Sequence, residues 1–170
     1  MVDKDNFLKK LNQNSAERIS DEQKKEAAKK EMIDKAKHDS SFYASEVKSL
    51  VSNVEKWLSE SSIKIVKKEI AVSEFLKDNL TQVNYNVFQF ALVYEGLSII
   101  FTPQGCLRFQ NSGLIDILVD QPKLTKVYED IALLVDSECK YQWFFSDNKN
   151  KFIVNGDTFR DFVLKTIGIE

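Results

Sequence analysis

Apolar residues recur at helical spacing between Ser41 and Ser59. The members of this pattern lie three or four residues apart: Tyr43, Val47, Leu50, Val51, Val54, Trp57 and Leu58. This spacing places them on one face of a helix and the polar residues between them on the other. We therefore predict an amphipathic helix that packs on the protein's own sheet, with a partner helix as the alternative cover.

The preceding residues 20–38 also favour a helix, but one with little apolar surface. They are mostly Glu, Gln, Lys and Ala, and the sparse apolar members are Ala27, Ala28, Met32, Ile33 and Ala36. Ser20, followed three residues later by Gln23, has the form of a capping box and predicts a helix start at Ser20. Because such a helix buries little, we expect it to fray unless a second chain or a partner supports it.

Two small apolar groups lie in this polar region. Phe7, Leu8 and Leu11 share one helical face, and Met32 and Ile33 follow within the polar stretch. We interpret these five residues as partner-binding, with a frayed terminus as the alternative for the first three. A heptad frame places Ile19, Glu26 and Ile33 on one seam, which is too polar to specify a coiled coil.

The second half of the chain alternates in the manner of strands. Residues 83–94 and 97–102 each place apolar side chains at every second position, and Glu95-Gly96 between them predicts a hairpin turn. We expect Pro103–Gly105 to end the second strand. The further predicted strands are 106–110, 114–120, 140–146 and 151–154, with one at 63–66 that extends toward Val72. Residues 73–80 fit either a helical turn or a loop.

Two segments near the end of the chain complete this prediction. Residues 125–136 fit either a helix or a strand, and we choose a strand. A last helix carries Phe159 and Phe162, with Asp157 or Thr158 as its cap and Gly168 at its end.

The sequence thus predicts an α+β fold. A polar helical arm (residues 1–40) precedes a single domain (residues 41–170), in which a mostly antiparallel meander of five to seven strands is covered by the amphipathic helix and a short last helix. All five glycines and both prolines, and ten of the twelve Phe residues, lie after residue 74. The material for turns and for the core therefore lies in the second half.

The charge balance limits the classes of partner. The chain carries 24 Lys and Arg against 26 Asp and Glu, a formal charge of −2. This balance argues against direct nucleic-acid binding through a broad positive field. No stretch has the length of a membrane span, and the polar start lacks the form of a secretory signal, so we expect a cytoplasmic protein with no membrane partner.

Residues for catalysis or metal binding are sparse in the sequence. His38 is the one histidine and lies between Lys37 and Asp39, where we expect a solvated side chain. No zinc, phosphate-loop or dinucleotide motif occurs, so we expect no cofactor. Cys106 and Cys139 are interpreted as buried, reduced thiols, with a thiol nucleophile as the alternative.

An acidic segment runs from Asp116 to Glu138. Asp116, Asp120, Glu129 and Asp130 are its proposed partner-binding residues. Three interpretations remain open: a solvated rim of the sheet, a divalent-ion site, and a face for a basic protein.

These features favour a non-catalytic protein-binding module over an enzyme. The arm would pair two copies of the chain or dock to a larger assembly. The alternatives are an inhibitor or immunity-type protein, whose acidic surface blocks a basic nucleic-acid-handling partner, and a small carboxylate or thiol hydrolase.

Overall fold

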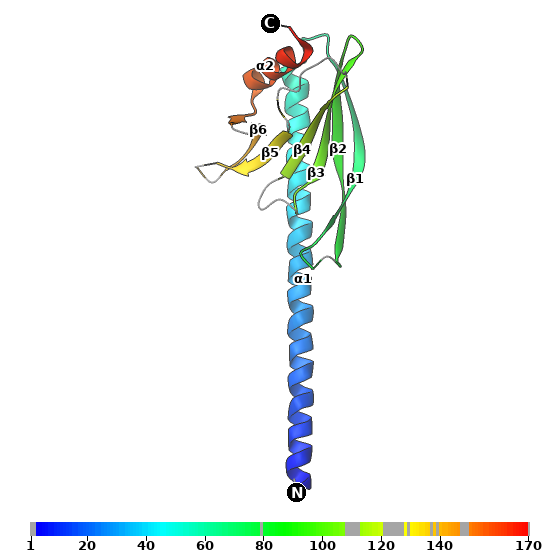
Figure 1. Cartoon of the computed structure of the whole chain (residues 1–170), viewed down its shortest axis with the longest axis vertical. Coiled ribbons are helices and arrows are strands. Elements are labelled where there is room, and N and C mark those ends of the chain that lie inside the picture. The colour runs from blue at the N-terminus through cyan, green and yellow to red at the C-terminus, as the bar shows by residue number, and fades with distance from the viewer. Residues whose placement is uncertain are drawn as a thin grey trace.

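A computed structural model describes residues 3–78, 80–107, 113–120, 128, 130–136, 138, 140–146 and 150–169. In this part of the chain, one long helix is followed by a seven-stranded antiparallel sheet and a short second helix (Figure 1). The predicted α+β fold is confirmed.

Helix α1 (Lys4–Trp57) is a single helix of 54 residues. The helix runs through Ser20 without a break, so the predicted start at Ser20 is wrong. Residues 4–19 contain neither glycine nor proline, and once a helix exists each added residue gains a hydrogen bond, so nothing local stops it there. The apolar face predicted for residues 41–59 is confirmed within α1.

The strands follow each other in space in the same order as in the sequence. Each neighbouring pair is antiparallel, as the short connections predict. The strands are β1 (Lys64–Phe75), β2 (Gln82–Tyr94), β3 (Leu97–Gly105), β4 (Gly113–Val119), β5 (Asp130–Val135), β6 (Tyr141–Ser146) and β7 (Lys151–Ile153).

Two strand boundaries differ from the prediction because of tertiary contacts. Strand β1 continues through Phe75, where we predicted a turn or loop, since its last residues pair with the start of β2. Strand β3 continues through Pro103 to Gly105, and its register with β4 shifts between these two residues. A bulge of this kind accommodates a proline that cannot donate to the ladder.

The predicted strand at 106–110 is wrong for its first two residues. Cys106 and Leu107 lie in a bend, because their backbone N–H groups donate to the Glu74 side chain instead of a neighbouring strand. Residues 108–110 lie outside the described residues. The choice of a strand in 125–136 is confirmed for residues 130–135, whereas Tyr128 is not in a strand, and residues 125–127 and 129 are not described.

Helix α2 (Gly156–Ile167) is capped by Asn155, not by the predicted Asp157 or Thr158. The Asn155 side chain accepts hydrogen bonds from the N–H groups of Asp157 and Thr158, and the Thr158 hydroxyl accepts from the Asn155 N–H. This reciprocal capping box outweighs either later residue as a cap. Gly168 ends the helix in the left-handed conformation, as predicted.

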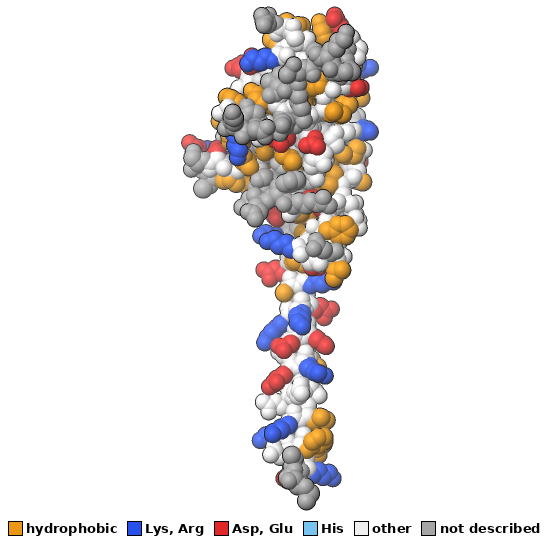
Figure 2. All heavy atoms as spheres, in the orientation of Figure 1, with side chains coloured by type: hydrophobic (Ala, Val, Ile, Leu, Met, Phe, Trp, Pro, Cys, Tyr) orange, Lys and Arg blue, Asp and Glu red, His pale blue; other side chains and the backbone are white. Residues whose placement is uncertain are grey.

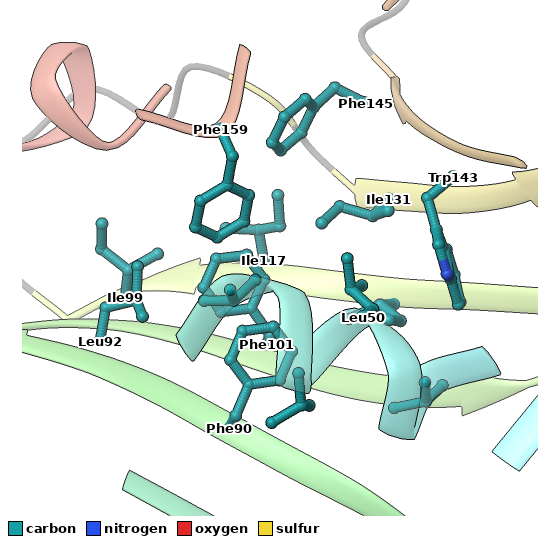
Figure 3. Packing of buried hydrophobic residues seen from close by; sticks show 14 of the residues in the cluster. Leu50, Phe90, Leu92, Ile99, Phe101, Ile117, Ile131, Trp143, Phe145 and Phe159 are labelled. Atoms are coloured by element: carbon teal, nitrogen blue, oxygen red, sulfur yellow. The ribbon is translucent and has the colours of Figure 1, made fainter. Parts of the chain in front are cut away.

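The core lies between one face of the sheet and the two helices. Phe90 and Phe101 stack with ring centroids 4.4 Å apart, and Phe101 also packs on Phe159 of α2. Leu50 of α1 reaches the same cluster (Figure 3). We call this face of the sheet the inner face.

Tyr43 joins α1 to the start of β4. Its hydroxyl donates a 2.6 Å hydrogen bond to the carbonyl of Leu114, 71 residues away in the sequence. The Tyr43 ring fills the space that a side chain at Gly113 would need. A glycine at this position lets the helix approach the strand closely.

Candidate docking surfaces

The arm, defined here as residues 4–31 of α1, is exposed along its whole length. At 1.5 Å per residue it spans about 40 Å. Figure 1 shows that this part of α1 extends beyond the sheet. An isolated helix with this composition is marginal in water, so its continuity with the packed half of α1 supports it.

Phe7, Leu8 and Leu11, the arm patch, lie near the beginning of the arm. Phe7 is 56% and Leu11 53% exposed, and Leu8 is comparably exposed. The figures show these first turns far from the sheet (Figures 1 and 2). The structure therefore leaves all three predicted residues accessible to another molecule.

Met32 and Ile33 have a different environment. They are half-buried and pack against a small cluster of Ala36, Leu76 and Val83, where the end of the β1–β2 hairpin meets α1. Their apolar character serves this contact within the chain. The five residues predicted to bind a partner therefore divide into an exposed group in the arm and a half-buried group about 35 Å further along the helix.

The structure brings two of the predicted acidic residues together. Asp116 of β4 lies directly opposite Asp130 of β5 in the register. Asp116 and Asp120 are exposed, whereas Asp130 is half-buried. Glu129 lies outside the described residues. Directly opposed positions share one face of a sheet, so the Asp116 and Asp130 side chains lie on the same face.

The face of the sheet opposite the core, here called the outer face, carries an apolar row beside these acids. Val66 lies opposite Ala91, Ala91 opposite Ile100, and Ile100 opposite Leu118. Val66 and Leu118 are exposed, and the two residues between them are half-buried. Sequence periodicity missed this row because its members come from four strands.

Glu74 forms a buried polar site that the sequence analysis also missed. Its side chain is buried, and its carboxylate accepts hydrogen bonds from the Tyr85 hydroxyl at 2.6 Å, the Cys106 N–H at 3.1 Å and the Leu107 N–H at 3.0 Å. The available signal was the alternation Val72, Glu74, Leu76, which puts an acid at an inward position. Glu74 therefore anchors the bend after β3 to strand β1.

Burial makes the side chains around Glu74 poor nucleophiles. Burial, with the nearby Glu74 charge, raises the pKa of Cys106 to about 12. Burial and the hydrogen bond to Glu74 also raise the pKa of Tyr85 above its usual value. At neutral pH the Cys106 thiol is protonated, and a protonated thiol is a weak nucleophile and metal ligand.

One open pocket of about 400 Å³ lies where the end of α1 meets α2. Its lining includes Trp57, Leu58, Ile63, Arg160 and Val163. The Arg160 guanidinium is held by Asp157 at 2.6 Å. The pocket therefore has an apolar wall and a polar rim that includes Glu60 and the ion-paired Arg160.

Other candidate chemistry is sparse in the described residues. His38 is exposed on α1, as its polar neighbours predict. Within the described ranges, no three His, Cys, Asp or Glu side chains gather closely enough to hold a metal ion. Cys139 lies outside those ranges.

The surfaces therefore define an α+β protein with an exposed helical arm and an apolar, partly acidic outer face. No helix in the described part of the chain combines the length and the hydropathy needed to cross a bilayer. No family model, curated protein or solved structure matches the chain.

Proposed function

We propose that this protein is a non-catalytic protein-binding module that uses its helical arm to pair with another copy or to dock to a larger assembly. One observation carries the proposal. On the N-terminal side of its first packed turn, α1 extends as a helix for about 40 Å and exposes Phe7, Leu8 and Leu11 there. Large apolar side chains grouped on a projecting element are typical of interaction sites.

The chemistry around Glu74 supports this choice over a thiol hydrolase that uses Cys106. The raised pKa of Cys106 keeps its thiol protonated at neutral pH. Glu74 uses its carboxylate oxygens in hydrogen bonds that hold the fold. Neither group is available to attack or deprotonate a substrate.

The proposal is tested by arm variants of the full chain. Replacing Phe7, Leu8 and Leu11 together by Ser should abolish capture of partners in a pull-down, or reduce the mass in solution measured by light scattering. The matched control replaces Asn12, Gln13 and Asn14 by Ser, which changes the same helix without removing apolar surface. If the arm-patch variant and the control both retain the wild-type mass and the wild-type binding profile, the proposal fails.

The inhibitor function is a second candidate, supported by the directly opposed Asp116 and Asp130. It requires a basic nucleic-acid-handling partner whose binding weakens steeply with salt. Replacing Asp116 and Asp120 by Asn should then weaken that binding, with Glu22→Gln plus Glu26→Gln on the exposed arm as a control that removes the same charge. An affinity that depends neither on salt nor on these substitutions would eliminate the inhibitor function.

A further inference from the structure

The outer face of β4 has a defined pattern of charge and apolar surface. Ile115 and Ile117 of β4 point into the core and are fully buried, so the alternate residues point outward. Those outward residues include Asp116 and Leu118, and the exposed Asp120 follows directly after the end of β4. Leu118 is 60% exposed and lies between two exposed carboxylates.

Leu118 does not stand alone, because the apolar row from Val66 to Leu118 continues across four strands. An antiparallel sheet with one solvated face normally carries polar residues on that face. The Leu118 end of this exposed apolar row lies beside carboxylates and therefore fits a partner with apolar side chains and a positive charge nearby.

The arm supplies that complementary chemistry. Lys4, Phe7, Leu8 and Leu11 occupy positions i, i+3, i+4 and i+7 and so lie on one helical face. At 100° per residue, Lys10 borders one edge of this face and Asp5 borders the other, whereas Lys9 falls on the far side. The face thus presents three large apolar residues, with Lys4 at its end and one charge of each sign at its edges.

The arm cannot reach the outer face of its own sheet. Helix α1 packs on the inner face and is unbroken through Trp57, so the arm patch stays well away from β4 (Figure 1). A second copy carries both surfaces, and the formal charge of −2 gives little net repulsion between copies.

We infer that the arm patch of one copy docks on the outer face of β4 in a second copy, with Leu118 against Leu8 and Leu11 and with Asp116 and Asp120 facing Lys4 and Lys10. This inference rests on the proposed function, because it names the partner of the arm. If each copy docks its arm on the other, the result is a closed dimer. If docking runs in one direction only, successive copies form an open filament.

A charge-swap series on the full chain tests the contact by sedimentation velocity. Wild type should self-associate. Lys4→Glu with Lys10→Glu, and separately Asp116→Lys with Asp120→Lys, should each weaken association at least about tenfold, which corresponds to about 1.4 kcal/mol. All four changes together should restore it. Lys9→Glu with Lys24→Glu, which alters the net charge as much as the first pair, should leave association unchanged.

Three results would overturn the inference. A wild-type chain that stays monomeric at its highest soluble concentration overturns the second copy as the partner, while capture of another protein through the arm keeps the proposed function. Association that depends on the arm patch but not on Asp116 and Asp120 indicates arm–arm pairing. Failure of the four-fold variant to restore association, with its circular dichroism unchanged, excludes a direct contact between the two surfaces.

Discussion

The hydroxyl of Tyr85 donates a 2.6 Å hydrogen bond to Oε2 of Glu74, across the ladder that joins β1 to β2. The two residues are diagonal neighbours, because Val72 is the partner of Tyr85 in the register and Glu74 the partner of Val83. The same carboxylate holds the N–H groups of the bend after β3. One buried acid therefore ties three parts of the sheet together.

Removing the Glu74 carboxylate should destabilise the fold strongly. Glu74→Ala leaves two backbone N–H groups and one hydroxyl without their acceptor, and each buried unsatisfied group costs about 1–3 kcal/mol. We expect a loss of about 3–5 kcal/mol in the free energy of unfolding, measured by urea denaturation. Tyr85→Phe removes a single donor and should cost about 1–2 kcal/mol. A loss below about 1 kcal/mol for Glu74→Ala would contradict this role.

The close approach of Gly105 to Glu74 predicts a second effect on stability. Gly105 has φ +112°, and a side chain there would collide with the Glu74 carboxylate. Gly96 has φ +85° but open space around it. In thermal unfolding, Gly96→Ala should show only the backbone cost of about 1 kcal/mol, whereas Gly105→Ala should cost at least twice as much. Equal losses would show that the fold does not depend on this approach.

The Cys106 thiol should make stability fall at alkaline pH. Its folded pKa is raised to about 12, from an ordinary value of 9.0. Between these two pH values the folded state binds more protons than the unfolded state. The thiol's contribution to the free energy of unfolding is therefore fully present below pH 9 and is lost as the pH rises toward 12. Urea midpoints measured upward from pH 8 should decline less steeply in Cys106→Ala. An unchanged slope in that variant would be evidence against the raised pKa.

The same burial should protect the thiol from alkylation. In a Cys139→Ser background, Cys106 should react with iodoacetamide at pH 8 much more slowly than after denaturation in urea, because its reactive thiolate form is scarce. Mass spectrometry over time gives both rates. Equal rates in the folded and denatured protein would restore Cys106 as a candidate nucleophile.

Truncating a leucine should lower the free energy of unfolding much more in the core than in the arm. Leu50 is 2% exposed in the core, and Leu50→Ala should cost about 2–5 kcal/mol in urea denaturation. Leu11 is 53% exposed in the arm, and Leu11→Ala should change the free energy of unfolding by less than about 0.5 kcal/mol in a dilute monomer. A large loss for Leu11→Ala in the monomer would show that the arm folds back on the body.

Local patterns predicted those elements whose residues repeat with a clear period. The apolar face from Tyr43 to Leu58 gave the packed half of α1, and the turn Glu95-Gly96 gave the β2–β3 hairpin. The left-handed Gly168 likewise marked the end of α2. These features depend on neighbours within a few residues, which a sequence shows directly.

The sequence by itself determined the α+β class, the exposed polar arm with its group of Phe7, Leu8 and Leu11, and most strand positions. Only the tertiary structure decided that Pro103 lies within a strand, that Glu74 is buried under the bend at Cys106, and that Asp116 faces Asp130. It also aligned Val66 with Leu118 in one outer row. Strand register and burial set these relationships between residues remote in the sequence, and no local period records them.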